Sequence, residues 1–210
     1  MAAIKHKAQR VAVFIDTQNL YHSAKNLFRA RVNFGAVLKE ALAGRVLIHA
    51  AAYVVTTESG DEKAFFEALT KIGIETKTKD LQVFYGGAKK ADWDVGMAID
   101  AVKFASKVDA IVLATGDGDF VPLIEYLKSL GVQAEIIAFG KSSSQRLRES
   151  ADDFIDMGEN PKNFLLTSSR SAYLPSFIVG SNPEQPEPPE EGDVDDDTEP
   201  TVVGSDTDGK

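Results

Sequence analysis

The sequence predicts an α/β domain with a mostly parallel central sheet. Apolar runs of strand length recur along the chain, and amphipathic helical patterns separate them. This alternation favours parallel strands joined by right-handed crossovers. The chain has 210 residues, of which 43% are hydrophobic and 9% are aromatic. Residues 1–160 therefore hold enough apolar material for one core, and we expect a single globular domain there.

The first strand, Val11–Ile15, is apolar throughout and rich in β-branched residues, as expected for a strand covered on both faces. Similar runs predict strands at Val46–Val55, Ala110–Thr115 and Val132–Phe139. Helical patterns lie at Gln18–Phe28, Phe34–Ala43, Asp61–Ile72, Asp94–Ala105 and Phe120–Leu130. A short amphipathic piece, Ser144–Ser150, leads to Phe154 and Ile155, which predict an edge strand.

The charge of the chain is concentrated near its C-terminus. Lys and Arg number 23 against 32 Asp and Glu, which gives a net charge of −9 at pH 7. Residues 181–210 hold 11 acids and one base, so residues 1–180 hold 21 acids and 22 bases. The whole-chain charge argues against nucleic-acid binding, but the near-neutral first part of the chain removes that objection.

The last part of the chain differs in composition from the domain. Residues 181–210 contain five of the eight prolines, and we predict a disordered, acidic, proline-rich tail because such a segment buries too little apolar surface. Residues 161–180 are predicted to connect the tail to the domain. Their apolar segment Ala172–Val179 either docks a protein partner or packs on the domain.

Several function classes are excluded by composition. The chain has no cysteine and three histidines, which removes disulfides, cysteine nucleophiles and thiolate zinc sites. The apolar run Val11–Ile15 is too short for a signal peptide, and no stretch approaches the roughly 18 apolar residues of a membrane span. We expect a soluble, cytoplasmic protein without a membrane partner.

Four aspartates are placed where α/β proteins bind ligands. Asp16 ends the first predicted strand, Asp117 and Asp119 follow Ala110–Thr115, and Asp94 begins the helix that precedes that strand. Ligands gather outside the carboxyl ends of parallel strands. If the two strands are neighbours, the four carboxylates converge on one edge of the sheet.

Such a cluster requires cations, because like charges raise each other's pKa. All-oxygen ligation without histidine or cysteine favours a hard cation, Mg²⁺ or Mn²⁺. Asn19 would lie on the first turn of the following helix, where it could orient a water or a phosphate oxygen, and Thr115 could do the same. Gly116 and Gly118 would let the backbone turn sharply and approach a phosphate.

Three blocks carry a family resemblance: Phe14–Tyr21 (FIDTQNLY), Lys89–Ala101 (KKADWDVGMAIDA) and Ala114–Ile136 (ATGDGDFVPLIEYLKSLGVQAEI). In that order they resemble the blocks of NYN-domain proteins of the LabA-like group, relatives of PIN-domain nucleases. The later Leu147 and Ala151–Phe154 are similar to the closing segment of that family. The resemblance spans about residues 10–157.

The resemblance implies a three-layer α/β/α fold and metal-dependent cleavage of RNA that leaves 5′-phosphate and 3′-hydroxyl ends. Asp16, Asp94, Asp117 and Asp119 fall on the metal-binding acids of the family, Asn19 on its accompanying amide, and Asp100 on a further recurrent acid. The chain departs from the family in having Asp92 and Trp93 where an aliphatic residue usually precedes the middle acid, which leaves the shape of the substrate entrance open.

Each of these residues also has a purely structural interpretation. Asp16 and Asp119 could cap the helices that follow them, and Asp92 could be the N-cap of the helix that begins at Asp94. Asp100 is as well suited to pair with Lys103, or to donate support to the site through a hydrogen bond, as to contact the metal itself. Lys89, Lys90 and Trp93 could bind a phosphate backbone and stack a base, or form a solvated loop with an aromatic core residue. His22 is interpreted as a helix-surface residue and His49 as a core histidine with satisfied hydrogen bonds.

The leading hypothesis is a metal-dependent endoribonuclease that acts on single-stranded RNA. Asp16, Asp94, Asp117 and Asp119 would hold one or two metal ions for attack of an activated water. The alternative is a non-catalytic RNA-binding or regulatory module that recruits a protein partner through the tail, and homo-oligomerisation stays open. A haloacid-dehalogenase-like phosphatase ranks last, because Asp16-Thr17-Gln18 lacks the second aspartate of that pattern. If the tail competes with RNA for the basic surface, its deletion should strengthen RNA binding at low salt.

Overall fold

A computed structural model of the chain describes residues 3–56, 63–80, 82–83, 89–90 and 93–166. The predicted tail 181–210, the segment Ala172–Val179 and Asp92 lie outside these residues. Among the described residues, no helix is both long and apolar enough to cross a membrane.

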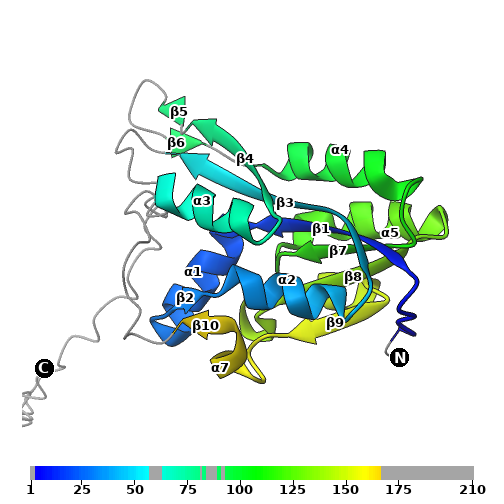
Figure 1. Ribbon diagram of the computed structural model, residues 1–210. Helices are drawn as coiled ribbons and strands as arrows, with labels where there is room; N and C mark the ends of the chain where they lie inside the picture. The colour runs from blue at the N-terminus through cyan, green and yellow to red at the C-terminus, as the bar shows by residue number, and fades with distance from the viewer. Residues whose placement is uncertain (1–2, 57–62, 81, 84–88, 91–92, 167–210) are drawn as a thin grey trace, which may run out of the picture. The chain divides into compact units, whose positions relative to one another are not determined.

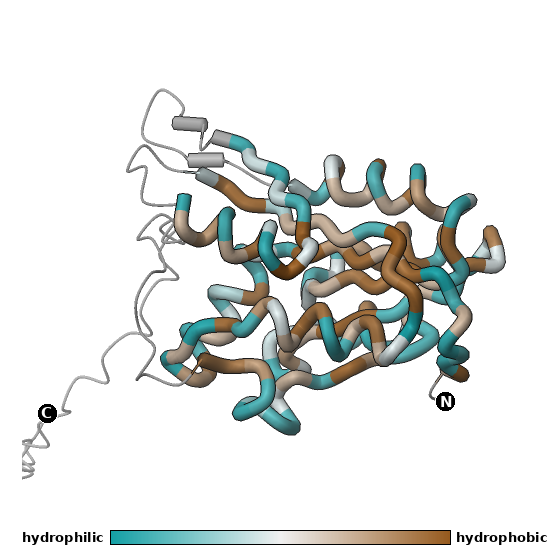
Figure 2. Tube along the Cα trace, in the orientation of Figure 1, coloured by the Kyte–Doolittle hydropathy of each residue, from teal (hydrophilic) through white to brown (hydrophobic). Residues whose placement is uncertain are grey.

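The centre of the fold is a six-stranded parallel sheet in the order β4-β3-β1-β7-β8-β9. Its strands are β1 (Arg10–Asp16), β3 (Val46–Thr56), β4 (Glu75–Asp80), β7 (Ala110–Ala114), β8 (Gln133–Ala138) and β9 (Asp153–Asp156). All four predicted strands and the predicted edge strand are present. Residues 11–15 of β1 are fully buried, and the core runs along β1, β3, β7 and β8, where Figure 2 shows long hydrophobic stretches.

Strand β4 was not predicted, because its sequence ETKTKD has no apolar run. It pairs with β3 on one side only and so forms an edge of the sheet. Lysines are common on edge strands because they discourage pairing with other chains. A hydrophobic pattern cannot reveal a strand of this kind.

The helices cover both faces of the sheet, with α1, α2 and α3 on one face and α4 and α5 on the other (Figure 1). Their bounds are α1 (Thr17–Phe28), α2 (Phe34–Leu42), α3 (Lys63–Lys71), α4 (Asp94–Ala105), α5 (Val121–Ser129), α6 (Gln145–Ser150) and α7 (Pro161–Phe164), with 3₁₀ turns η1 (Gly118–Phe120) and η2 (Gly140–Ser142). This is the expected three-layer α/β/α arrangement, and α4 has the predicted bounds.

The predicted helix Phe120–Leu130 begins differently from expectation. The turn η1 precedes α5, whose N-cap is Phe120 and has no side-chain capping bond. Asp119 therefore does not cap this helix, which corrects that interpretation. Asp117 is the N-cap of η1, since its carboxylate accepts from the Asp119 backbone N–H at 2.9 Å.

Two small two-stranded antiparallel sheets complete the described fold. Strand β2 (Arg31–Val32) pairs antiparallel with β10 (Leu165–Leu166), and β5 (Gln82–Val83) pairs with β6 (Lys89–Lys90). Phe164, before β10, is buried and its carbonyl accepts from the Asn33 N–H at 2.7 Å. The described part of the chain thus returns to the end of α1 after its last helix.

His49 contradicts the prediction of a satisfied core histidine. Its ring stacks on Phe104 with centroids 4.3 Å apart, but its buried Nε2 has no hydrogen-bond partner among the described residues. Burial lowers the pKa of this histidine, which favours the neutral ring. His49 is therefore held by contacts of its ring, and its Nε2 is not satisfied by the described residues.

Candidate metal centre

The carboxyl ends of β1 and β7 lie side by side in the sheet. The two strands are adjacent and parallel, and Ile15 pairs with Ala114. Asp16 is the last residue of β1, while Asp117 and Asp119 follow β7 by three and five residues. The condition for convergence of these carboxylates, that the two strands be neighbours, is met.

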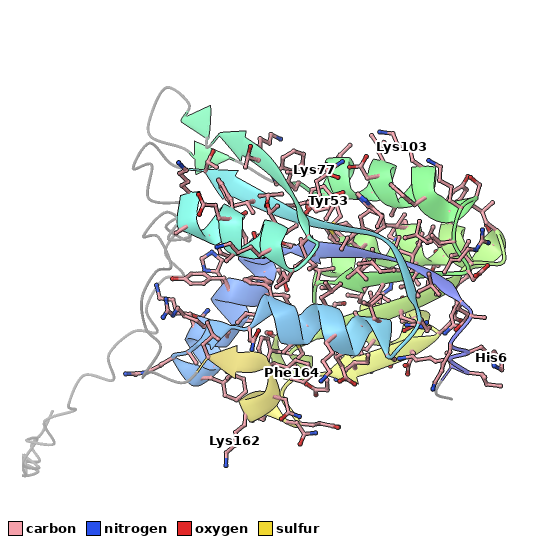
Figure 3. All side chains as sticks on the ribbon, viewed as in Figure 1. His6, Tyr53, Lys77, Lys103, Lys162 and Phe164 are labelled. Carbon is pink, nitrogen blue, oxygen red and sulfur yellow. The ribbon has the colours of Figure 1, made fainter. Side chains whose placement is uncertain are left out.

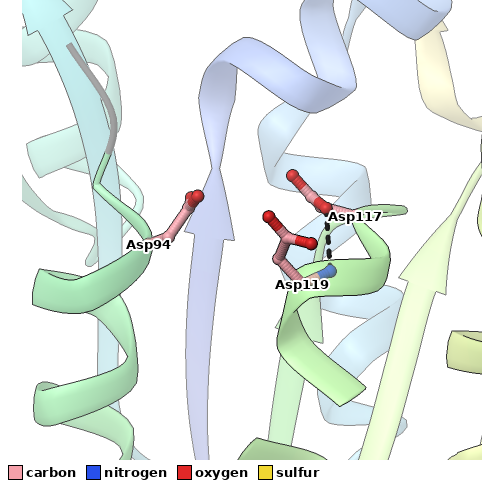
Figure 4. A group of neighbouring side chains, drawn as sticks. All are labelled: Asp94, Asp117 and Asp119. Atoms are coloured by element: carbon pink, nitrogen blue, oxygen red, sulfur yellow. Dashed lines mark hydrogen bonds between the residues drawn. The ribbon is translucent and has the colours of Figure 1, made fainter. Parts of the chain in front are cut away.

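Three carboxylates form a tight group at this edge. Asp94, Asp117 and Asp119 each offer an oxygen, and these oxygens lie within 4.8 Å of one another. Figure 4 shows Asp94 reaching from the first turn of α4 toward the two aspartates of the loop after β7. The topology brings α4 to this place because α4 packs against β1 and β7.

Asp16 lies beside this group, and the negative charges of Asp94 and Asp117 act on it. Its carboxylate caps α1 by accepting from the Asn19 N–H at 3.0 Å, and it accepts from the Thr115 hydroxyl at 3.2 Å. The capping interpretation of Asp16 is therefore correct. It does not exclude a metal, because each carboxylate has more than two lone pairs to offer.

Burial raises the pKa of Asp16 to about 6, and the neighbouring charges of Asp94 and Asp117 add to this, while the hydrogen bonds from Asn19 and Thr115 oppose it. A desolvated carboxyl among like charges is energetically unfavourable when ionised. A cation in the cluster would reverse this effect, since it lowers the energy of every ionised carboxylate around it.

Asn19 and Thr115 connect the two loops of the site. The Asn19 side-chain oxygen accepts from the Gly116 N–H at 2.8 Å, so α1 is tied to the loop after β7. Thr115 is fully buried, and its hydroxyl bonds Asp16 and accepts from the Asp117 N–H at 3.2 Å. These bonds fit a role in positioning the carboxylates better than direct contact of Thr115 with a substrate.

The glycines of the loop serve close packing within the protein. A Cβ on Gly116 would lie 2.6 Å from Ser143 Oγ and 3.1 Å from Ser143 Cα, and one on Gly118 would lie 2.8 Å from Ser144 Oγ. The Ser144 N–H also donates to the Gly116 carbonyl at 2.9 Å. The sequence pattern suggested an approach to phosphate, whereas here the loop is pressed against residues 143–144, a contact that sequence reasoning missed.

Asp100 lies outside the group. Its carboxylate accepts from Lys77 at 2.6 Å, from Tyr53 at 2.9 Å and from Lys103 at 3.1 Å, and Figure 3 labels these three partners, which come from β4, β3 and α4. Burial opposes ionisation, but the bonds from these partners lower the pKa of Asp100. The pairing with Lys103, one of the interpretations left open, is present.

Trp93 is held as part of the protein interior. Its indole N–H donates to the Val54 carbonyl at 3.0 Å, and its ring meets Tyr53 edge-on with centroids 5.4 Å apart. A Cβ on Gly96 would lie 2.7 Å from the ring, so glycine is required beneath it. These contacts favour the aromatic core interpretation over base stacking. Lys89 and Lys90 form β6, and their side chains lie outside the described residues.

Two hollows in the described surface were not foreseen. A basic pocket of about 570 Å³ at the C-terminal end of α1 is lined by Tyr21, Lys25, Asn26, Arg29, Ala30 and Arg31. The four-residue spacing of Tyr21, Lys25 and Arg29 on one helical face was the available signal. A second groove, between α4 and α5, includes Asp94 and Asp119 in its wall.

The donor set fits a divalent cation. It consists of carboxylate oxygens, the ligands that Mg²⁺ and Mn²⁺ prefer. No lysine or arginine of the described chain forms an ion pair with Asp16, Asp117 or Asp119. Negative charge is thus gathered here by the fold without a cationic side chain to balance these three aspartates.

The chain is similar to known proteins along most of its described length. The sequence pattern of the NYN domain matches residues 10–166. The chain is 27% identical over 164 residues to the low amplitude and bright protein LabA of Synechococcus elongatus, covering 73% of this chain and 86% of that protein. A solved structure of a protein of unknown function from Vibrio parahaemolyticus superposes with a TM-score of 0.70 at 27% identity, covering 78% of this chain and 100% of the other.

Proposed function

This chain belongs to the NYN domain family, a group of PIN-like nucleases, and we propose that it is a metal-dependent endoribonuclease that cleaves RNA in the cytoplasm. The observation that carries the proposal is the convergence of Asp94, Asp117 and Asp119 within 4.8 Å, beside Asp16. Without a bound cation such a cluster would only destabilise the fold, because like charges at this range repel one another.

The four aspartates would hold Mg²⁺ or Mn²⁺. When bound, the cation would supply the Lewis acidity that activates water and neutralises charge on a phosphodiester. The residues of the chain prepare this site. Asp117 is fixed by its bond to the Asp119 N–H, and Asp16 by its bonds to Asn19 and Thr115.

Asn19 has a positioning role in this proposal. Its side-chain oxygen is used by the Gly116 N–H, which leaves the amide NH₂ as a donor that can face a phosphate oxygen. Through the same bond, Asn19 sets the distance between the end of β1 and the loop after β7. Both aspartate-bearing loops are therefore held by the one side chain.

The experiment compares two aspartates of similar chemistry. Asp117→Asn keeps the bond to the Asp119 N–H, because an amide oxygen also accepts, but it removes one negative charge from the cluster. Asp100→Asn removes a charge from the same protein outside the cluster. Purified full-length variants are incubated with single-stranded RNA and Mg²⁺ or Mn²⁺, with EDTA as the metal-free control.

Cleavage by the wild type and by Asp100→Asn, abolished by EDTA and by Asp117→Asn, is the expected result. The products should carry 5′-phosphate ends that can be ligated. Cleavage that survives Asp117→Asn would show a contaminating nuclease or a different site. RNA binding without metal-dependent turnover would instead support a regulatory module of the same fold.

A further inference from the structure

The groove between α4 and α5 has an unusual composition for a surface hollow. Its volume is about 370 Å³, and its apolar wall is formed by Val95, Ala98, Val102, Pro122, Leu123 and Tyr126. Val95 is 69% exposed and Tyr126 is 47% exposed. Hollows of roughly 300–1,000 Å³ with apolar walls are typical of small-ligand sites. This surface is therefore sized for a flat, apolar group.

The groove is continuous with the carboxylate group. Asp94 and Asp119, two of the three clustered aspartates, are part of its wall. A ligand in the groove would thus be next to whatever is bound at the carboxylates. None of the described residues that line the groove is basic, so it offers nothing to a phosphate backbone and much to an apolar surface.

We propose that this groove binds an unpaired nucleobase of the RNA substrate, with the ring of Tyr126 as its stacking partner. The inference rests on the proposed function. Every phosphate of a polynucleotide is linked through one sugar to a base, so a base beside a phosphodiester held at the carboxylates reaches the adjoining surface. Bases have two apolar faces, and stacking on an exposed aromatic ring is how proteins bind single strands without regard to sequence.

This assignment selects single-stranded substrates. In a double helix the faces of the bases are covered by their neighbours, and only their edges are accessible in the grooves. A base can enter the α4–α5 groove only if it leaves the stack. Double-stranded RNA would therefore present its phosphates to the carboxylates but leave the groove unfilled.

A second copy of the chain is the competing occupant, and the charges of the groove disfavour it. A protein interface depletes charged residues at its centre, and a buried carboxylate without a cationic partner is costly. Contact between two copies across this groove would bury the carboxylate of Asp119, which forms no ion pair among the described residues, against apolar surface. An RNA substrate with its cations would neutralise this carboxylate.

The test measures binding separately from cleavage. A short fluorescein-labelled oligoadenylate is titrated with full-length protein in Ca²⁺, a cation that occupies oxygen sites but replaces Mg²⁺ poorly in catalysis, and anisotropy is read. The same titration uses an abasic oligomer of equal length, which has the backbone but no bases. Tyr126→Ala removes the ring, Tyr126→Phe keeps it, and Ile99→Ala is the matched control, because Ile99 is 50% exposed on α4 but lines a different hollow.

Tyr126→Ala should weaken binding of oligoadenylate roughly ten-fold, in line with the loss of one stacked base, and leave binding of the abasic oligomer unchanged. Tyr126→Phe and Ile99→Ala should bind as the wild type does. An equal loss on both oligomers, or no loss, would overturn the assignment. A wild-type dimer by light scattering that Tyr126→Ala converts to a monomer would also overturn it, in favour of a second copy.

Failure of this assignment can be distinguished from failure of the proposed nuclease activity. If the groove binds bases but Mg²⁺ and Mn²⁺ give no turnover, the nuclease proposal is wrong and the assignment of the groove as a base-binding site is supported. If turnover is metal-dependent and Tyr126→Ala does not change it at subsaturating RNA, the nuclease proposal is supported and the assignment of the groove is wrong. A rise in KM with unchanged kcat is the expected pattern, because the ring contacts the substrate away from the reacting atoms.

Discussion

Helix α4 carries two aspartates whose surroundings differ in charge. Asp94, at the first residue of the helix, converges with Asp117 and Asp119. Asp100, six residues later, accepts from Lys77, Lys103 and Tyr53. The fold surrounds Asp100 with two lysines and a tyrosine hydroxyl, and it brings Asp94 close to two further carboxylates. The Asp100 carboxylate is balanced by side chains of the protein, whereas a bound cation would stabilise the group of Asp94, Asp117 and Asp119.

The two regions differ in the direction in which they move a pKa. Desolvation and like charges raise the pKa of Asp16, beside Asp94, to about 6. Lys77 and its companions lower the pKa of Asp100 against the effect of burial. Carboxyls whose pKa is raised, such as Asp16, are typical of functional sites. Carboxyls whose pKa is lowered by cationic neighbours, such as Asp100, are typical of structural ion pairs. Substitutions that remove a charge in each region test this difference.

The largest expected effect is on cleavage. Asp94→Asn should lower metal-dependent turnover by at least ~100-fold, because it removes a ligand charge from the reacting centre. Asp100→Asn on the same helix should change turnover less than about three-fold, since its carboxylate is bonded to lysines and is not part of the group. Initial rates on single-stranded RNA at saturating Mg²⁺ measure both. Equal losses would mean that the two aspartates belong to one functional unit.

The next effect is on the pH dependence of stability without metal. The pKa of Asp16 is about 6 in the folded protein and about 3.9 when unfolded. Between these values the folded state keeps a proton that the unfolded state has released, so the free energy of unfolding falls as pH rises, by up to ~3 kcal/mol from this group. Asp16→Asn keeps an acceptor for the Asn19 N–H and should remove this component.

Urea unfolding in EDTA at several pH values checks this prediction. Wild type should lose stability relative to Asp16→Asn from about pH 4.5 to about pH 7. The effect of Asp100 on the pH dependence of stability has the opposite sign. Because its pKa is lowered in the folded protein, it contributes stability above the pKa of the unfolded state, and this contribution is lost as the pH falls through the pKa of the folded state. A difference between wild type and Asp16→Asn that is flat with pH would show that Asp16 is ionised without penalty.

A third effect is the sign of the stability change at neutral pH in EDTA. Asp117→Asn should stabilise the metal-free protein by ~0.5–1 kcal/mol, because it removes one of several like charges. Asp100→Asn should destabilise it by ~1–3 kcal/mol, because it weakens charged hydrogen bonds and leaves two lysines without their anion. Chemical denaturation at pH 7 compares the two. Destabilisation by both substitutions would contradict the idea that the first group is electrostatically strained.

Excess Mg²⁺ should remove the advantage of Asp117→Asn. A cation that binds the folded state alone stabilises it by an amount that grows with its concentration. The wild type should therefore gain more than the variant when Mg²⁺ replaces EDTA, and the order of their midpoints should invert. An identical shift in both proteins would place the cation elsewhere.

The sequence predicted the features of the site that depend on the order of elements along the chain and on the apolar pattern of the strands. β1 and β7 are continuous apolar runs, and their terminal aspartates stand out because a charge follows directly on buried residues. The adjacency of the two strands was a condition that the sequence could state but not decide. Strand β4 carries Lys77 and escaped prediction, because an edge strand needs no apolar run.

Contacts that join distant segments could not be predicted. The partners of Asp100 lie 47 and 23 residues away, in β3 and β4, so only Lys103 was visible from helical spacing. The hydroxyl of Thr115 is used within the site, and Trp93 bonds a carbonyl of β3. The sequence left the role of Trp93 open and suggested a ligand contact for Thr115, and packing between elements determines the bonds that both side chains make.

The smallest expected effect separates the two lysines that hold Asp100. Lys77 approaches at 2.6 Å with 28% of its side chain exposed, whereas Lys103 approaches at 3.1 Å with 64% exposed. An exposed pair three residues apart on a helix contributes ~0.3–0.5 kcal/mol. Lys103→Met should therefore cost no more than this, and Lys77→Met more. Double-mutant cycles with Asp100→Asn measure the coupling energy between each lysine and Asp100. A larger coupling energy for Lys103 would mean that the i,i+3 pair on α4 keeps this carboxylate apart from the cation site, and that the bond from Lys77 in β4 does not.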